Sequence, residues 1–318
     1  MARVTVIGAT GHIGSYLVPR LVEAGHEVVA VSRGRAKPYR GSKLWEVVET
    51  IALDRDGLEA EERFGATIVE TRPDIVVDMI CFLPESARQL VAALDGHVSH
   101  YVSIGTIWTY GHSLAVPTRE DTPKRPFGDY GTRKAAIEAF LLHEARANGF
   151  PATILHPGHI VGPGWAPLNP AGNFNPAVFA TLARGERLAL ANFGLETVHH
   201  VHADDLARLV MAAIANWSAA VGESFNAVSP QALTLRGFAE GMAAWFGQPA
   251  DLAFLPFEAW GKTQREADRA ATWEHIARSP SCSMEKARRL LGYAPQHGSL
   301  AAVQEAVADM IARGALRV

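Results

Sequence analysis

The amino-acid sequence predicts an α/β protein whose parallel sheet carries helices on both faces. Apolar runs and amphipathic stretches alternate through the first half of the chain, and glycines follow the first apolar run directly. The expected strands cover residues 4–7, 27–31, 75–77, 101–104 and 152–155. The expected helices between them include residues 13–24, 86–94 and 130–148. Strand, helix and strand at this spacing indicate βαβ units with right-handed crossovers.

The helix over residues 130–148 has the strongest pattern, because alanine, leucine and glutamate dominate it and Gly149 follows as a C-cap. From 156 to 175 the chain is rich in glycine, proline and asparagine, so we expect a loop there. Helical patterns return over residues 204–216, 232–246, 284–291 and 300–313.

The composition is typical of a folded globular protein and excludes disordered, collagen-like and heptad-repeat chains. Of the 318 residues 48% are hydrophobic and 20% charged, and the net charge is −3. A near-neutral chain has no general attraction for nucleic acid or anionic lipid, so we expect neither partner. Cys81 and Cys282 form no disulfide framework or zinc motif, which fits a reducing compartment. We see no signal peptide and no bilayer-spanning segment, so we expect a cytoplasmic protein.

The segment GATGHIG stands directly after the first expected strand and opens the first helix. Its glycines allow the backbone to approach a pyrophosphate, and the helix N-terminus offers N–H groups and a positive dipole end. The spacing is GxxGxxG and not GxGxxG, but the strand before it and the helix after it indicate a dinucleotide site. The candidate cofactor-binding residues here are Gly8, Thr10, Gly11, His12, Ile13 and Gly14.

The end of the second strand distinguishes between the two nicotinamide cofactors. NAD sites carry an acidic residue there for the ribose hydroxyls, whereas this chain has Ser32 and Arg33. These side chains suit a 2′-phosphate, which favours NADP, with NAD as the alternative. The competing interpretation is a solvated basic loop. Asp54, with Arg55 beside it, follows a third strand and is placed to meet the adenine edge; a simple turn aspartate is the alternative.

Tyr130 and Lys134 lie four residues apart on the strongest helix and therefore share one face. An ammonium group beside a phenol favours the phenolate, so we expect Lys134 to lower the pKa of Tyr130. Tyr130 can then exchange a proton with an alcohol or ketone. Thr106 follows the strand that ends at Ile104, where its hydroxyl can orient a substrate oxygen.

Taken together, these motifs resemble the extended short-chain dehydrogenases/reductases of the NAD-dependent epimerase/dehydratase type. The matching segments are GATGHIG, SIGTIWTYG (103–111), YGTRK (130–134), HPGHIVGPG (156–164), HVHADDLA (200–207) and SMEKARRLLGYAP. The resemblance implies a Rossmann doubly wound parallel sheet with a smaller C-terminal substrate-binding lobe. The NAD(P)-binding domain would comprise residues 1–165 plus about 195–230, and the lobe residues 166–194 and 231–318.

The same resemblance implies roles for individual residues. Thr106, Tyr130 and Lys134 form the catalytic set, and Lys134 also binds the nicotinamide ribose. Four further residues would lie along the cofactor: Ile80, Cys81, Pro157 and Gly158. The family commonly dimerises through two helices, here about 84–94 and 130–148, so we expect a homodimer.

Two departures from the family pattern bear on the substrate. His156 replaces the common arginine before Pro157, and Val198 stands where sugar-nucleotide enzymes carry an arginine for the diphosphate. Substitutes for that arginine could be Arg184, Arg187 or Arg265. The substrate-contact candidates are Trp108, His156, His159, Asn173 and Asn175, and Trp165 and Phe174 could add an apolar wall. The numerous histidines lack helical metal-ligand spacing, so we expect no metal.

The sequence thus predicts an NAD(P)-dependent oxidoreductase or epimerase for a small sugar-like or ketone substrate, with Tyr130 as acid/base. One alternative is a sugar-nucleotide epimerase or dehydratase with tightly held NAD. Another, from a different class, is a non-catalytic protein that senses a dinucleotide or binds RNA, because a fold does not settle function.

Overall fold

A computed structural model describes residues 1–318, and its central element is a seven-stranded parallel sheet. The strand order is β11-β6-β5-β4-β1-β2-β3, with the change of direction beside β1. The strands are β1 (Arg3–Ile7), β2 (Glu27–Ser32), β3 (Glu49–Ala52), β4 (Ile75–Asp78), β5 (His100–Ile104), β6 (Ala152–Pro157) and β11 (Ser224–Ala227). The sheet is therefore doubly wound, as the sequence predicts.

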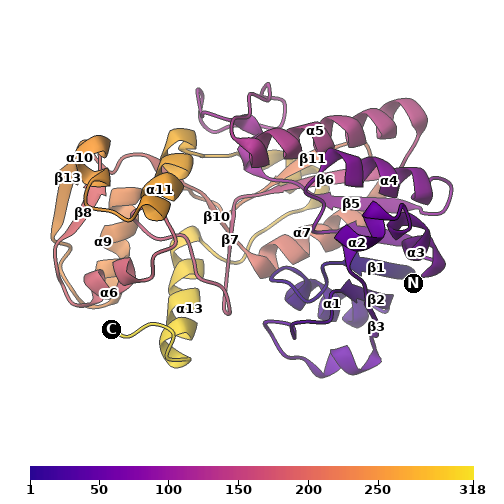
Figure 1. The fold of residues 1–318 in the computed structure, drawn as a ribbon, viewed down its shortest axis with the longest axis horizontal. Helices are drawn as coiled ribbons and strands as arrows, with labels where there is room; N and C mark the ends of the chain where they lie inside the picture. The colour runs from indigo at the N-terminus through magenta and orange to yellow at the C-terminus, as the bar shows by residue number, and fades with distance from the viewer.

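Helices cover both faces of this sheet (Figure 1). One face packs against α1 (Gly14–Glu23), α7 (Ala203–Ala215), α8 (Trp217–Ala220) and α12 (Glu285–Leu291). The other packs against α2 (Arg55–Ala60), α3 (Phe64–Glu70), α4 (Pro84–Leu94) and α5 (Asp129–His143). The inner strands are apolar runs buried on both sides, which is what two helical layers require.

A second unit with its own hydrophobic core lies at one end of the molecule (Figure 1). Its helices are α6 (Ala177–Ala183), α9 (Leu235–Trp245), α10 (Phe257–Gly261), α11 (Glu266–Arg278) and α13 (Ser299–Ala312). Three strand pairs accompany them: β8 (Leu188–Ala191) with β13 (Leu252–Leu255), β9 (Thr197–Val198) with β12 (Leu233–Thr234), and β7 (His159–Val161) with β10 (His200–His202).

The predicted strands of the central sheet are confirmed to within two residues, and so are the two helices that cover it first, α1 and α4. The helix predicted over 130–148 is α-helical to His143 and continues as a π-turn, η3 (Glu144–Asn148). Gly149 ends it in the left-handed region, at φ 79°, as expected of a C-cap. Two short 3₁₀ helices complete the chain, η1 (Lys43–Val47) and η2 (Ile107–Tyr110).

Two predictions about local structure were wrong. The segment 156–175 is not all loop, because β6 extends to Pro157 and β7 follows it. The helix α11 was not predicted at all, although acidic residues in its first turn and His275 and Arg278 in its last are the charges that a helix dipole favours. No helix in the structure is long and apolar enough to cross a membrane.

Candidate active site at the carboxyl ends of the strands

The glycine turn after β1 has a backbone that only glycine tolerates. Gly8 has φ +87°, and a Cβ there would stand 2.9 Å from Cγ2 of Ile80. A Cβ on Gly14 would stand 2.0 Å from the carbonyl oxygen of Ala9. No side chain caps the N-terminus of α1, and the N–H groups of Thr10, His12 and Ile13 in the turn before it bond no acceptor of the protein, so they remain available to an anion. The turn therefore fits the diphosphate of a dinucleotide.

The other residues predicted in this turn lie in different settings. Thr10 is half-buried, while Ile13 packs into the core beneath the sheet and contributes only its backbone to the turn. His12 is 6% exposed and stacks on Trp165, with ring centroids 5.2 Å apart. Its pKa is lowered to about 4 by burial, so the ring is neutral beside the phosphate position.

The charged side chains of the loop after β2 are exposed to solvent. Ser32 Oγ accepts a hydrogen bond from the backbone N–H of Gly34 at 3.2 Å. Arg33 is exposed and forms no ion pair, whereas Arg35 lies 3.9 Å from the exposed carboxylate of Asp54. The guanidinium of Arg33 thus has no protein partner of opposite charge.

Arg55 does not face the cofactor side as predicted. Its side chain is buried and its Nη1 donates to both carboxylate oxygens of Asp78 at 2.9 and 3.0 Å, while Nε pairs with Glu59. Asp78 is fully buried at the end of β4, and a buried carboxylate needs such a partner. We therefore remove Arg55 from the candidate cofactor-binding residues.

Four predicted residues follow the strands β4 and β6. Ile80 lies over Gly8, but Cys81 turns its side chain into the core, and burial raises the pKa of its thiol to about 12. Pro157 ends β6, and the N–H of Gly158 donates to Ala227 O at 3.0 Å. These backbones line the same sheet edge as the glycine turn, where ligands of doubly wound sheets bind.

Thr106, Tyr130 and Lys134 meet at this edge. Thr106 follows β5, and its Oγ1 accepts from the N–H of Trp108 at 3.2 Å. Lys134 is buried in α5 and its Nζ donates to Ile104 O at 2.7 Å. Tyr130, one turn earlier on α5, is 42% exposed and packs edge-on against Trp108. The spacing in sequence therefore does bring the three side chains together.

The pKa of Tyr130 is raised, which is opposite to the direction predicted. Burial in the cleft is the main cause, and a hydrogen bond with Thr106 opposes it. Lys134 does not act as predicted because its Nζ is held by Ile104 and lies 6.0 Å from the tyrosine ring centroid. Burial also lowers the pKa of Lys134 to about 8. Tyr130 therefore carries its proton near neutral pH.

An aromatic wall stands beyond Tyr130. Trp108 contacts His275 and His159 edge-on, with ring centroids 5.3 and 6.2 Å away, and these histidines lie 4.6 Å from each other. Burial lowers the pKa of His275 to about 4 and holds the pKa of His159 well below its usual range. Both rings are therefore neutral. His275 and Phe174, whose centroids are 5.6 Å apart, extend the wall toward the lobe.

The one cation beside this wall is already neutralised. Arg278 is 1% exposed, and its guanidinium lies 3.8 Å from the ring centroids of both Trp108 and Phe127. It donates to Phe127 O at 2.6 Å and pairs with Glu274. Sequence analysis missed His275 and Arg278 because it missed the helix α11 that carries them.

Three of the residues predicted to contact the substrate instead form hydrogen bonds within the protein. Asn173 is 1% exposed and bonds Asn169 and Thr272, and Asn175 donates to Asp268 at 3.2 Å. His156 is fully buried behind Thr106, with both ring nitrogens engaged. Of the five predicted residues, Trp108 and His159 remain beside Tyr130.

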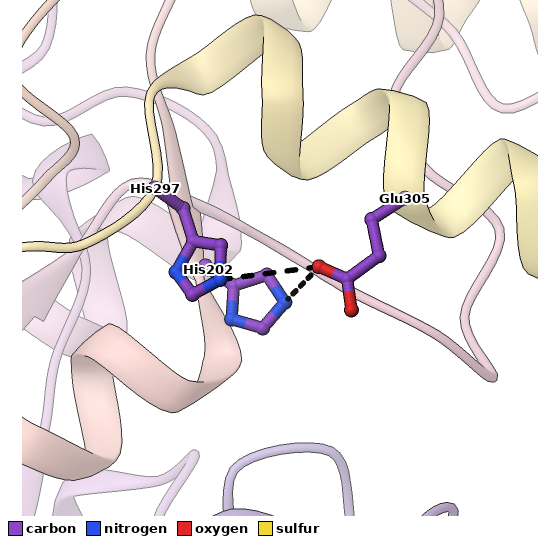
Figure 2. Close-up of side chains that lie close together, drawn as sticks. All are labelled: His202, His297 and Glu305. Carbon is purple, nitrogen blue, oxygen red and sulfur yellow. Dashed lines mark ion pairs between the residues drawn. The ribbon is translucent and has the colours of Figure 1, made fainter.

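A cluster of His202, His297 and Glu305 has ligand atoms close enough to hold a metal (Figure 2). However, Nδ1 of His202 accepts from the N–H of Asp204 at 3.1 Å, so in the neutral ring the proton is on Nε2, which faces Glu305 at 3.2 Å. A metal requires that lone pair. The cluster instead lies between the start of α7 and α13, where Asp205 accepts hydrogen bonds from the backbone and the ring of His297.

Comparison with known proteins agrees with this geometry. The family model described as the NAD dependent epimerase/dehydratase family matches residues 4–227. The 2′-dehydrokanamycin reductase of Streptomyces kanamyceticus is 29% identical, over 83% of this chain and 72% of its own. The UDP-glucose 4-epimerase of Mycolicibacterium smegmatis is 30% identical, over 80% and 86%. The dTDP-glucose 4,6-dehydratase of Bacillus anthracis, solved in complex with NAD, has a TM-score of 0.75 at 17% identity, covering 99% of this chain and 98% of that one.

A doubly wound sheet with this glycine turn and this Thr–Tyr–Lys cluster defines a short-chain dehydrogenase/reductase. The chain belongs to the NAD-dependent epimerase/dehydratase family, the extended branch of that class. It is accordingly an enzyme that uses a nicotinamide dinucleotide.

Proposed function

We propose that this protein is an NADP-dependent oxidoreductase that acts on a carbinol or ketone carbon of a small, uncharged, sugar-like or ketone substrate. The observation that carries the proposal is the cluster of Thr106, Tyr130 and Lys134 at the sheet edge that carries the glycine turn, with Tyr130 packed on Trp108 and Lys134 held by Ile104 O. A bound nicotinamide supplies or accepts the hydride at its C4 position. A tyrosine that keeps its proton suits the direction in which a ketone is reduced.

The proposed residue roles follow from their positions. The Thr106 hydroxyl orients the substrate oxygen, and Tyr130 donates its proton to that oxygen as negative charge develops on it. Lys134, anchored to Ile104 O, would bind the nicotinamide ribose through its ammonium group. In the reverse direction Tyr130 accepts the alcohol proton.

Preference for NADP is proposed from the β2 loop. A 2′-phosphate would lie at the end of β2, where Arg33 has an unpaired guanidinium and no carboxylate repels the phosphate. Arg35 is the second cation in reach, but Asp54 partly neutralises it. NAD remains the alternative, as the family description includes it.

An uncharged substrate is proposed from the aromatic wall. A desolvated diphosphate needs cationic partners, and the histidines at this wall are neutral. The three arginines considered as substitutes are paired with carboxylates: Arg184 with Glu186 at 2.7 Å, Arg187 with Asp251 at 3.0 Å and Arg265 with Asp268 at 2.7 Å. The relative that reduces 2′-dehydrokanamycin supports a substrate without a nucleotide.

A sugar-nucleotide epimerase or dehydratase with tightly held NAD is the second candidate, favoured by the relative named as a UDP-glucose 4-epimerase.

We further propose a division of the chain into two domains. Residues 1–165 with about 195–230 form the NAD(P)-binding domain, and residues 166–194 and 231–318 form the substrate lobe. We also propose that the enzyme is a homodimer.

The test is a Tyr130→Phe variant assayed with NADPH against a panel of small ketones and keto-sugars. Loss of the proton donor should lower kcat by about 10²- to 10⁴-fold and leave NADPH affinity intact. His97→Gln is the control, because this exposed histidine precedes the amino end of β5 whereas Thr106 follows the carboxyl end. Unchanged turnover in Tyr130→Phe would refute the role of this tyrosine.

A further inference from the structure

Glu138 and His156 form a buried pair behind Thr106 that the proposed chemistry does not use. Glu138 is 4% exposed and His156 fully buried. His156 Nε2 lies 2.8 Å from Glu138 Oε1, and the backbone N–H of Thr106 donates to His156 Nδ1 at 3.1 Å. The imidazole thus links a helix carboxylate to the backbone of the threonine that faces Tyr130.

These contacts determine which nitrogen of His156 carries the proton. A backbone N–H can only donate, so Nδ1 must present its lone pair to Thr106. The proton of the neutral ring is then on Nε2, where it points at the carboxylate. Burial alone would raise the pKa of Glu138, but His156 and Lys124, whose Nζ is 3.4 Å away, lower it to about 2. Glu138 is therefore an acceptor over the working pH range.

One face of α5 holds the whole turn that contains Thr106. Tyr130, Lys134 and Glu138 recur every four residues, so they project from that face in a row. Lys134 binds Ile104 O, and Glu138 reaches Thr106 through His156. Gly105 lies against the imidazole, and a Cβ there would stand 2.5 Å from Nδ1. The imidazole of His156 therefore packs directly against the turn that carries Gly105 and Thr106.

We propose that His156, held in its Nε2–H tautomer by Glu138, is a positioning residue that fixes the Thr106 backbone and through it the hydroxyl that faces Tyr130. The inference rests on the proposed function for its effect on turnover.

Two substitutions at position 156 separate the two contacts. Asparagine places an amide oxygen where Nδ1 stood and keeps the acceptor for Thr106, whereas glutamine reaches toward Glu138 and leaves Thr106 without a partner. His156→Gln should lose about 10²-fold in kcat, because a misplacement of about 1 Å has that effect, while His156→Asn loses less than about tenfold. KM and NADPH affinity should stay the same in both variants.

The matched pair at position 138 is Glu138→Gln, which keeps an acceptor oxygen, and Glu138→Leu, which removes it. Glu138→Gln should retain more kcat than Glu138→Leu. Equal losses in both members of each pair would overturn the proposal.

A measurement without turnover keeps this test distinct from that of the proposed function. Nitrogen-15 NMR of the wild-type protein should show His156 with its proton on Nε2. Hydrogen exchange of the Thr106 amide should be faster in His156→Gln than in His156→Asn. A proton on Nδ1, or equal exchange in the two variants, would refute the positioning role whatever the substrate proves to be.

Discussion

Replacing Arg55 by methionine removes the guanidinium that neutralises Asp78 at the end of β4. Asp78 is fully buried and receives two bonds from Arg55, at 2.9 and 3.0 Å. After the change it keeps only the N–H of Ile80 and the hydroxyl of Tyr101, each at 3.1 Å. The buried carboxylate of Asp78 then has no cationic partner and accepts hydrogen bonds from these two neutral donors only.

The expected loss is large for a single side chain. Removing one partner of a buried ion pair costs about 3–5 kcal/mol, because the remaining charge stays desolvated. An unfolding entropy of about 2.1 cal/mol/K per residue gives about 0.7 kcal/mol/K for a chain of this length, so Tm should fall by about 4–7 °C.

Urea and thermal denaturation, followed by circular dichroism, measure this loss. The control is Arg63→Met, because Arg63 pairs with Glu61 on the surface with both side chains more than half exposed, and such pairs contribute little. NADPH affinity of the folded Arg55→Met protein should change by less than about threefold, since the side chain is already engaged inside. A stability loss below about 1 kcal/mol, or a large loss of affinity at unchanged stability, would return Arg55 to the cofactor site.

Three further results are expected. Arg33→Ala should weaken NADPH binding by about 10- to 150-fold in a fluorescence titration and leave NADH binding unchanged, as expected for one charge-assisted hydrogen bond; an equal effect on both would contradict the 2′-phosphate role. The free energy of unfolding in urea should decrease as pH falls from 6.5 to about 4, because burial lowers the pKa of several histidines and the unfolded chain binds more protons there; a flat profile would contradict it. The histidines with a lowered pKa are His12, His100, His199 and His275. Light scattering should give a dimer mass, and a strictly monomeric peak at micromolar concentrations would reject the homodimer.

The sequence predicted the inner part of the sheet well because β1, β4 and β5 are buried on both faces and are therefore mainly apolar. The glycine turn was equally clear, since Gly8 and Gly14 occupy positions where a side chain would collide with backbone or with Ile80. At these positions the residue type that the folded structure requires is also the one that the local sequence pattern displays.

The lobe was harder to predict for a physical reason. Its strands β8, β9 and β13 have two to four residues, too few for a period to emerge, and α11 presents charge on most of its turns. The inward turn of Arg55 depends on Asp78, which is distant in sequence. The raised pKa of Tyr130 likewise depends on its burial in the folded cleft, which no local pattern in the sequence reveals.

The central claim is tested most directly by the cofactor that the protein retains and prefers. The purified protein is denatured, the released nucleotides are resolved by mass spectrometry, and the intact protein is titrated with NADPH and NADH. We predict little retained nucleotide and tighter binding of NADPH, as for a reductase that releases its cofactor at each turnover. Stoichiometric NAD⁺ surviving purification would contradict the account and would indicate an epimerase that regenerates its cofactor in place.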